Sequence, residues 1–312
     1  MGKSLYRYRR VTDYSIEELI NNQIIGTTND LMNDPYDCRY YYDEKFIKSF
    51  LDDNKIIKEY LLQKFQFKDD EIHLFIDFIA AQTEDLISKT FYTACFSECV
   101  DKEIMWSHYS DKGKGFVIEY DEDDIKNKLN AKKKKIENIY RSMAGLFRIK
   151  YVSERDDLSE FLRRFFIIFS DQINADYSFH EITKYKFMQE MAKNIVTHKN
   201  IDWKYEGEYR LIWPNFVKKG NMLQPGNECI INSVLPKAIY IGENCSKKDR
   251  IILYLISKNK NIKLYQMKVT NGSKKFRLEY EEINDILIDS GINRCCFSVR
   301  DEYYYALNNR FK

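Results

Sequence analysis

The chain has 312 residues, of which 44% are hydrophobic and 31% charged, a balance typical of a folded globular protein. Fifty Lys and Arg side chains against 48 Asp and Glu leave a formal net charge of +2, so bulk charge favours no nucleic-acid or membrane partner. No apolar run approaches a membrane span of about 18 residues, and the first residues lack a secretory signal. Seven irregularly spaced cysteines predict no disulfide framework or zinc site, so we expect a cytoplasmic protein with reduced thiols and no metal.

The first elements predicted along the chain are a short strand and a capped helix. Aromatic and basic residues alternate over residues 5–9, which places Arg7 and Arg9 on one face of a strand. Ser15 is the expected N-cap of the helix, since Glu18 three residues later completes a capping box. The chain is therefore expected to open with a strand that carries two cations on one side.

A turn and a helical layer follow. In the segment Asn33-Asp34-Pro35-Tyr36, the residue before proline disfavours helix, which predicts a loop of fixed extended-to-turn geometry. Apolar residues recur at helical spacing between about residues 44 and 90. The break at Lys68-Asp69-Asp70 divides this stretch into two helices. We interpret it as an inserted helical layer without chemistry of its own.

The middle of the chain returns to strand composition. Residues 91–97 predict a strand that ends at Ser97, and residues 104–110 indicate a single helical turn. Residues 113–120 predict a strand entered through a glycine turn. The strongest basic run, Lys132-Lys133-Lys134-Lys135, is either a solvated loop or helix end, or a contact to phosphate.

The second half of the chain alternates strands with helices. The predicted elements are a strand at 145–152, a largely helical stretch at 157–195, an acidic strand at 203–213, a strand at 239–242, a helix at 247–257, and strands at 263–267 and 276–280. We expect an α+β fold with a mixed or antiparallel central sheet, in a single domain over residues 1–280 that holds the helical insertion. Residues 281–312 form an appended tail, in which Cys295-Cys296 and Tyr303-Tyr304-Tyr305 suggest an interface or a helix packed on the core.

The acidic strand is the most informative stretch of the chain. Glu206 and Glu208 are two residues apart, so on a strand both carboxylates point to the same face. Two neighbouring acids repel each other unless a cation or a hydroxyl faces them, which favours a site over a purely structural strand. The alternative is the solvated face of a half-exposed sheet.

Several motifs in one order resemble a widespread bacterial family that is still labelled a domain of unknown function. Such genes are often found beside mobile elements and defence genes. The resemblance runs from about Leu5 to Tyr265. It rests on Asn33-Asp34-Pro35-Tyr36, Ala94-Cys95-Phe96-Ser97, Met105-Trp106-Ser107-His108-Tyr109 with Gly115, Trp203-Lys204-Tyr205-Glu206-Gly207-Glu208-Tyr209-Arg210 and Ile239-Tyr240-Ile241-Gly242.

The order of the site residues is in turn similar to the ADP-ribosyltransferase superfamily, whose members split NAD and transfer ADP-ribose. That superfamily has an Arg or His on its first strand, a Ser or Tyr on a middle strand and a Glu on a later one. Arg7, Ser97 and Glu206-Gly207-Glu208 match that order. The chain departs from it at Cys95-Phe96-Ser97, where the arginine-specific class has Ser-Thr-Ser, and in its long helical insertion. The resemblance implies a central sheet split into two packed halves.

The resemblance also implies roles for the predicted site residues. Glu208 would face the oxocarbenium-like ribose, and Glu206 would orient the acceptor or take its proton. Ser97 would hold Glu208, and Arg7 would bind the pyrophosphate of NAD, a role that Arg9 could also fill. The remaining cofactor-binding residues are the aromatic side chains expected against the nicotinamide ring, and the turn and strand residues beside them: Tyr36, Trp106, Tyr109, Asn33, Asp34 and Arg210.

Each assignment has a structural alternative. Trp106 and Tyr109 are equally consistent with core aromatic residues, and Ser97 with a hydroxyl bonded to backbone. Arg7 could pair with an acidic surface residue, the Asn33-Asp34 turn could be architectural, and Arg210 could only neutralise Glu208. These alternatives stay open from the sequence.

The function expected from the sequence is that of an NAD-consuming ADP-ribosyltransferase-like enzyme, acting as a bacterial toxin or anti-phage defence effector. NAD would be its substrate, with a protein or nucleic-acid acceptor, or water in a plain NAD glycohydrolase. An inhibitory or activating partner protein is compatible with such a role. A second hypothesis is a metal-dependent nuclease in which Asp34, Glu206 and Glu208 hold Mg²⁺. A third is a non-catalytic module that senses a nucleotide or binds a partner protein.

Overall fold

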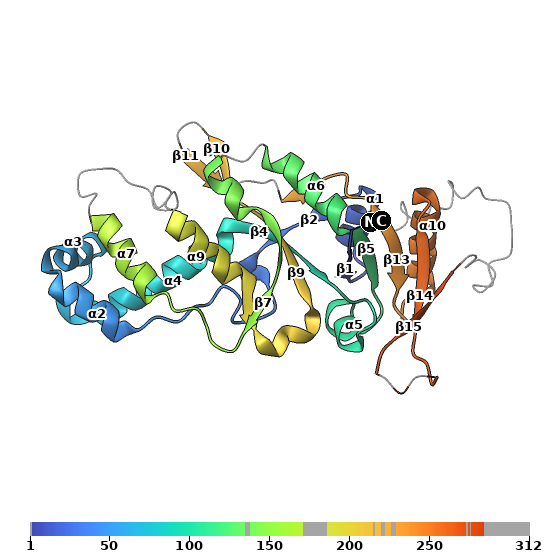
Figure 1. Cartoon of the computed structure of the whole chain (residues 1–312), viewed down its shortest axis with the longest axis horizontal. Helices are drawn as coiled ribbons and strands as arrows, with labels where there is room; N and C mark the ends of the chain where they lie inside the picture. The colour runs from blue at the N-terminus through green and yellow to red at the C-terminus, as the bar shows by residue number, and fades with distance from the viewer. Residues whose placement is uncertain are drawn as a thin grey trace.

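The computed structural model describes residues 2–134, 138–170, 186–214, 216–219, 222–225, 229–272, 274 and 276–283. The molecule is elongated (Figure 1). Most of its helices lie at one end, and at the other end a helix packs on one side of the sheet. Within the described residues no helix is long and apolar enough to cross a membrane. The Cys295-Cys296 pair and the Tyr303–Tyr305 run predicted for the tail lie outside the described residues.

A nine-stranded sheet forms the centre of the fold. Its strand order is β15-β14-β13-β5-β1-β4-β9-β6, and β3 pairs with β4 off this path. The bounds are β1 Ser4–Arg9, β3 Thr27–Thr28, β4 Phe91–Ser97, β5 Phe116–Asp121, β6 Gly145–Arg148, β9 Glu208–Pro214, β13 Pro236–Ile241, β14 Lys263–Lys268 and β15 Glu279–Glu282. Within this sheet only β13 and β14 run parallel, because helix α10 (Lys247–Lys260) connects them as a crossover. The α+β fold with a mixed or antiparallel sheet expected from the sequence is confirmed, and the sheet is mixed and mostly antiparallel.

Strands β1 and β4 touch at one point and then separate. β1 pairs with β5 over six residues, but with β4 only at Tyr6 and Ser97. Further along the same edge of β4, the short strand β3 pairs with Thr93 and Tyr92. An opening therefore lies between β1, β3 and β4. The two packed halves expected from the sequence are instead two arms of one continuous sheet, joined at this pair.

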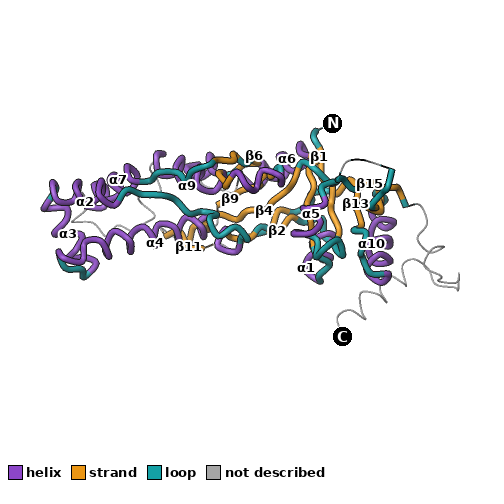
Figure 2. The backbone as a smooth tube through the Cα atoms, turned by 90° about the horizontal axis from the view of Figure 1, so that it is seen from below, coloured by secondary structure: helices purple, strands orange, loops and turns teal. Residues whose placement is uncertain are grey.

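Most helices lie beside one arm of the sheet or the other. The bounds are α1 Asp13–Ile20 and α5 Glu103–Tyr109 around the arm of β1 and β5, and α2 Glu44–Asp53, α3 Lys55–Phe65, α4 Ile72–Thr90, α7 Ser159–Ser170 and α9 Lys186–Thr197 in the layer at the far end. Helix α6 (Glu122–Lys133) contacts both arms, at β5 and at β6. Figure 2 shows this helical layer extending beyond the sheet. The layer has its own core, built from residues such as Ile47, Leu61, Phe75 and Phe166. It contains three helices between residues 44 and 90 rather than two, because the chain also breaks at Asn54.

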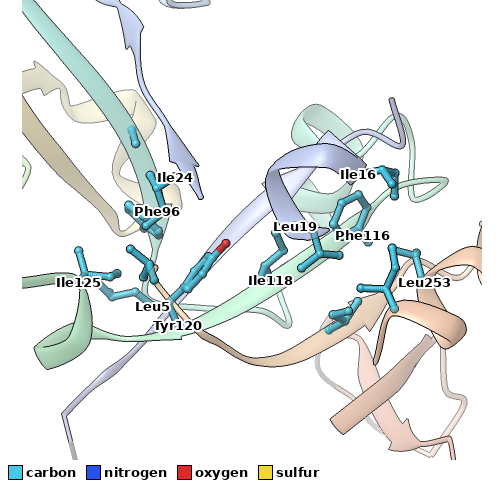
Figure 3. Close-up of a cluster of buried hydrophobic side chains, with 14 of the residues drawn as sticks. Leu5, Ile16, Leu19, Ile24, Phe96, Phe116, Ile118, Tyr120, Ile125 and Leu253 are labelled. Atoms are coloured by element: carbon cyan, nitrogen blue, oxygen red, sulfur yellow. The ribbon is translucent and has the colours of Figure 1, made fainter. Parts of the chain in front are cut away.

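The largest core packs α1 and α10 against the sheet. Leu5, Phe96 and Tyr120 lie at one side of this cluster, and Ile16, Leu19 and Phe116 lie at the other, under α1, as Figure 3 shows. Helix α1 begins earlier than expected, because Thr12 is its N-cap and accepts a hydrogen bond from the Ser15 N–H. Ser15 is the third helical residue, and its hydroxyl accepts from the Thr12 N–H. The predicted N-cap at Ser15 is therefore wrong. Glu18 is free of any capping role and is fully buried.

Six shorter strands form three small two-stranded sheets beside the main one. Strand β2 (Ile24–Ile25) pairs with β12 (Ile230–Ile231), and β7 (Lys150–Val152) runs parallel to β8 (His198–Asn200). A hairpin of β10 (Phe216–Lys219) and β11 (Met222–Pro225) follows β9. The strand expected at 145–152 is divided at Ile149, whose backbone N–H donates instead to the Glu208 carbonyl. This division brings β7 and β8 beside the start of β9.

Candidate functional site

A cleft of about 290 Å³ occupies the opening in the sheet. It is lined by β1, β4, the loop that follows β3, the end of α5, and the acidic segment that contains Glu206 and Glu208. The predicted site residues that line it are Arg7, Asn33, Ser97, Tyr109, Glu206, Glu208 and Arg210. Residues from six separate stretches of sequence thus converge on one cavity.

The two acids reach this cleft by a different route from the one expected. Glu206 is the last residue of a 3₁₀ helix (η4, Ile201–Glu206), and Glu208 is the first residue of β9. Gly207 between them has φ +53°, a left-handed conformation that reverses the chain. The shared strand face predicted for Glu206 and Glu208 is therefore wrong, although both carboxylates still meet. The glycine turn, rather than strand alternation, brings them together.

Gly207→Ala should destabilise the protein by about 1–2 kcal/mol, the usual penalty of a left-handed conformation for an L-residue. A Cβ at this position would also lie 2.7 Å from the Cγ of Glu98. Urea unfolding measures the difference from wild type. Gly272→Ala is the matched control, because its Cβ meets only the Thr270 hydroxyl at 3.3 Å, and we expect a change within about 0.5 kcal/mol. Equal effects at the two positions would contradict the assignment of Gly207 as the reversal point.

Lys199 on β8 bridges the two acids. Its Nζ lies 2.6 Å from Oε2 of Glu206 and 3.2 Å from Oε2 of Glu208. All three side chains are at least 95% buried. The ammonium also lies 4.6 Å from the ring centre of Trp203. The positive charge of Lys199 offsets the repulsion between the two neighbouring carboxylates that was expected from the sequence.

The outer oxygen of Glu206 faces α5 and the loop after β3. The Tyr109 hydroxyl donates to Oε1 of Glu206, and the Asn33 side-chain amide donates to the Tyr109 hydroxyl over 3.0 Å. Burial and the neighbouring Glu206 charge raise the pKa of Tyr109, so its hydroxyl stays protonated and remains a donor. Asn33 and Tyr109 therefore orient one carboxylate of the pair.

Glu208 is held from the opposite side by Arg210. The guanidinium Nε lies 2.8 Å from Oε1 of Glu208, while Nη1 and Nη2 bind the Asp37 carboxylate at 2.7 and 2.6 Å. Nη1 also donates to the Val196 carbonyl over 2.9 Å. Arg210 is fully buried and its donors are committed to protein groups. It positions Glu208, and we no longer assign it to cofactor binding.

The two acids have opposite pKa shifts. Burial raises the pKa of Glu206, and the Lys199 charge only partly opposes that rise. Burial also disfavours the ionised form of Glu208, but Arg210 and Lys199 outweigh it and lower its pKa to about 2. Glu208 is therefore a fixed anion, whereas Glu206 holds a proton more readily than an ordinary glutamate.

Residues 105–211 match the family DUF2971, a protein of unknown function. The match supports a likeness to a family of unknown function over residues 105–211 only, a shorter stretch than the residues 5–265 expected from the sequence. No curated protein and no solved structure matches the chain. The DUF2971 region contains Tyr109, Lys199, Glu206, Glu208 and Arg210, the acidic wall of the cleft. The opposite wall, with Arg7 and β4, precedes it in sequence.

Ser97 supports the acidic segment of the DUF2971 region through the backbone. Its hydroxyl donates to the Glu206 carbonyl over 2.6 Å and accepts from the Cys99 N–H over 3.1 Å. The expected bond from Ser97 to the Glu208 side chain is absent from the described contacts, although the two residues are paired across β4 and β9. Ser97 is therefore a positioning residue for Glu206.

The opposite wall of the cleft is cationic. Arg7 and Arg9 both pair with the buried Glu18, at 3.1 and 2.7 Å. Nη2 of Arg7 also donates to the Ile25 carbonyl over 2.6 Å, whereas its Nη1 is buried without a hydrogen-bond partner. Thr93 on β4 likewise has a buried hydroxyl without a partner. Buried polar atoms rarely stay unsatisfied in folded proteins, so these two mark a place for a polar ligand.

Arg7 enters the cleft from the other face of the sheet. Tyr6 is directly opposite Ser97, which is opposite Glu208, so these three share one face. Arg7 is the next residue of β1 and projects to the face covered by α1. Its guanidinium reaches the cleft because β1 and β4 separate there. The cleft thus passes from one face of the sheet toward the other.

Three predicted site residues lie elsewhere. Trp106 is 2% exposed, donates to the Val100 carbonyl and packs on Tyr8, so it is a core residue. Asp34 is buried and accepts from the Tyr36 N–H over 2.9 Å, which makes it a turn residue. Tyr36 lines a different cavity. The expected packing of Trp106 and Tyr36 on a nicotinamide ring in this cleft is therefore wrong.

Sequence reasoning missed Lys199, Asp37, Glu18 and Thr93. Nothing in the local pattern separates Lys199 from other lysines, because its partners follow it by seven and nine residues across a turn. Asp37 follows the Asn33-Asp34-Pro35-Tyr36 turn directly, and that proximity was the one available signal. Among the described residues, no group of three His, Cys, Asp or Glu side chains is arranged to hold a metal ion.

Proposed function

We propose that the protein is an NAD-consuming enzyme of ADP-ribosyltransferase type. The observation that carries this proposal is the opposite charge of the two cleft walls. Arg7 and Arg9 line one wall, and both pair with the single acid Glu18 behind it. Glu206 and Glu208 line the other wall with Lys199 and Arg210, and Arg210 also pairs with Asp37 behind the lining, so three carboxylates face two cations there. A ligand that suits both walls has an anionic part and a cationic part, as NAD has in its pyrophosphate and its nicotinamide ring.

The anionic part would bind at the cationic wall, between β1 and β4. Nη1 of Arg7 and the hydroxyl of Thr93 are buried donors that lack a protein acceptor. A guanidinium binds phosphate oxygens through charge-assisted hydrogen bonds. In Arg7 the Nη1 atom is available for such a bond, while Nη2 stays bonded to the Ile25 carbonyl. Both atoms belong to residues that line the cleft.

The split pKa values of the two acids suit glycosidic cleavage. As the bond between nicotinamide and ribose breaks, its electron pair leaves with nicotinamide and the ribose gains positive charge. An anion fixed at Glu208 would stabilise that charge, while Glu206 would receive the proton of the attacking nucleophile. Acid pairs whose environments drive their pKa values apart commonly divide these two tasks. With water as the nucleophile the same chemistry makes an NAD glycohydrolase.

The nuclease hypothesis gains no support from this geometry. Asp34 does not line the cleft, and the Lys199 ammonium already occupies the space between Glu206 and Glu208. The basic run is likewise divided: Lys132 donates to the Ile230 carbonyl, and Lys135 lies outside the described residues. We therefore retain the NAD reaction as the proposal.

Purified protein incubated with NAD should release nicotinamide, and Glu208→Gln should slow that release about 100-fold or more. Nicotinamide is measured by chromatography, with water alone and with mixed protein and nucleic-acid acceptors. Glu103→Gln is the matched control, because this exposed glutamate at the start of α5 lies outside the cleft. Its rate should equal that of wild type.

Because Glu208→Gln leaves Lys199 and Arg210 partly unpaired, Arg7→Lys provides a second variant. It keeps the charge beside Glu18 but loses the free Nη1, so we expect the KM for NAD to rise about tenfold at a similar kcat. Absence of nicotinamide release from folded wild type with every acceptor would reject the proposal. So would a Glu208→Gln variant that folds and remains fully active.

A further inference from the structure

A second cleft, of about 690 Å³, lies beside the first and shares Lys199 with it. Its walls are the loop from Tyr36 to Tyr41, the segment 152–157 and strand β8. We propose that this second cleft binds a nucleotide, with the base stacked on Tyr36 and the phosphate at Arg155. The binding does not depend on cleavage of NAD in the first cleft.

Tyr36 provides an aromatic surface that is open to solvent. It is 58% exposed, and its backbone N–H is fixed by the buried Asp34 carboxylate. The guanidinium carbon of Arg155 lies 5.9 Å from its ring centre. Tyr41 is a second exposed ring on the same wall, at 46%. Exposed aromatic rings held in place beside arginine are the usual platforms on which unpaired bases stack.

Arg155 is the cation in this cleft best placed for a phosphate. Its Nη1 donates to the Tyr40 carbonyl over 3.2 Å, and no carboxylate among the described residues lies within ion-pair distance of it. By contrast, Arg39 is paired with Glu84, and Lys199 with the two acids of the first cleft. Arg155 is also exposed, so it can bind an anion without losing an existing ion pair.

The remaining groups suit the polar edge of a base or a ribose. Asp156 binds Nδ1 of His198 at 2.8 and 3.0 Å, which fixes the ring and leaves Nε2 for a ligand. The Ser153 hydroxyl lies on the same lining. Charge in the cleft is balanced, with Arg39, Arg155 and Lys199 against Glu154, Asp156 and Asp157. A balanced lining favours a single nucleotide over the dense phosphates of a duplex.

The test is binding at low ionic strength, without NAD, of AMP and of short labelled single-stranded RNA and DNA. Anisotropy follows the labelled strands, and calorimetry follows AMP. Tyr36→Ala and Arg155→Ala should each weaken binding about tenfold or more, while Tyr36→Phe should keep it because the ring remains. The two arms distinguish a free nucleotide from one within a strand.

Two variants serve as matched controls. Tyr14→Ala removes a tyrosine that is 78% exposed on α1, and Arg277→Ala removes an exposed arginine paired with Asp101. Neither residue lines the second cleft, so both variants should bind as wild type does. The proposal is overturned if neither AMP nor the single strands bind, or if Tyr36→Ala and Arg155→Ala bind as tightly as wild type. Because NAD is absent, this failure is separate from a failure to release nicotinamide.

Discussion

Replacing Arg210 with alanine should lower the free energy of unfolding by about 3–5 kcal/mol, because it leaves two buried carboxylates without their cation. The guanidinium is fully buried, with Asp37 at 2.6 and 2.7 Å and Glu208 at 2.8 Å. Asp37 belongs to the loop after β3, and Glu208 begins β9. Without the guanidinium of Arg210, the loop would lose its ionic contact with the sheet, and Asp37 and Glu208 would lose this neutralising cation.

Arg148→Ala is the matched control for Arg210→Ala. Arg148 lies on the neighbouring strand β6, is 64% exposed and pairs with Glu98 at 3.2 Å. An exposed pair of this kind contributes about 0–1 kcal/mol. Urea unfolding of both variants gives the comparison. If Arg210→Ala costs no more than Arg148→Ala, the buried ion network does not hold the acidic wall as described.

Lys199→Met should also destabilise the protein by about 3–5 kcal/mol at pH 7, since the methionine fills the space but leaves Glu206 and Glu208 facing each other. The two carboxylates lose the ammonium at 2.6 and 3.2 Å that separates them. Like charges this close cannot both stay ionised without a large penalty. We therefore expect Glu206 to take up a proton in the variant.

The pH dependence of this effect has a defined sign. Lys199 lowers the pKa of Glu206 against the effect of burial, so its removal raises that pKa further. A carboxyl whose folded pKa lies above its unfolded value of 4.5 favours the folded state at low pH and loses that contribution as pH rises through the folded pKa. The deficit of Lys199→Met relative to wild type should therefore shrink between pH 7 and pH 5.

Unfolding of wild type and Lys199→Met at pH 5, 6 and 7 measures this trend. Lys3→Met is the control, because Lys3 is 41% exposed and pairs with Glu98 at 2.7 Å. Its effect should stay below about 1 kcal/mol and vary little over this range. A deficit for Lys199→Met that is constant, or that grows on acidification, would show that Glu206 does not carry the proton.

In wild type the ionised Glu208 makes the free energy of unfolding depend on pH in the opposite direction. Its folded pKa of about 2 lies below the unfolded value of 4.5. Its contribution to stability is therefore complete above pH 4.5 and is lost as the pH falls toward 2. The two acids of the site would thus respond differently to mild and strong acid.

The sequence was a good guide to which residues share the cleft. Arg7, Ser97, Glu206 and Glu208 all line it, although they are far apart in the chain. For Arg7, Ser97 and Glu208, strand composition and the order of motifs predicted the element, and antiparallel pairing of β4 with β1 and β9 brought those elements together. Local pattern suffices for such residues because a strand fixes where its side chains point.

The sequence was a poor guide to contacts made across turns and between layers. It placed Glu206 on a strand, because the left-handed turn at Gly207 is not evident from alternation alone. It could not supply Lys199 or Asp37, whose partners depend on how β8 and the loop after β3 pack on β9. It also mistook Trp106 for a binding residue, since a core tryptophan and a ligand-facing one look alike in sequence.

The single contact between β1 and β4 leaves the main chain of residues 94–96 without a neighbouring strand on that side. The peptide N–H and C=O groups there are a row of fixed dipoles at the edge of a cavity, held in place by β9 on the other side. Amides of this kind recognise a ligand by shape and hydrogen-bond direction, whatever side chains stand nearby. A substitution that leaves β4 paired with β9 can therefore change the charge of the cleft while this stretch of backbone keeps its form.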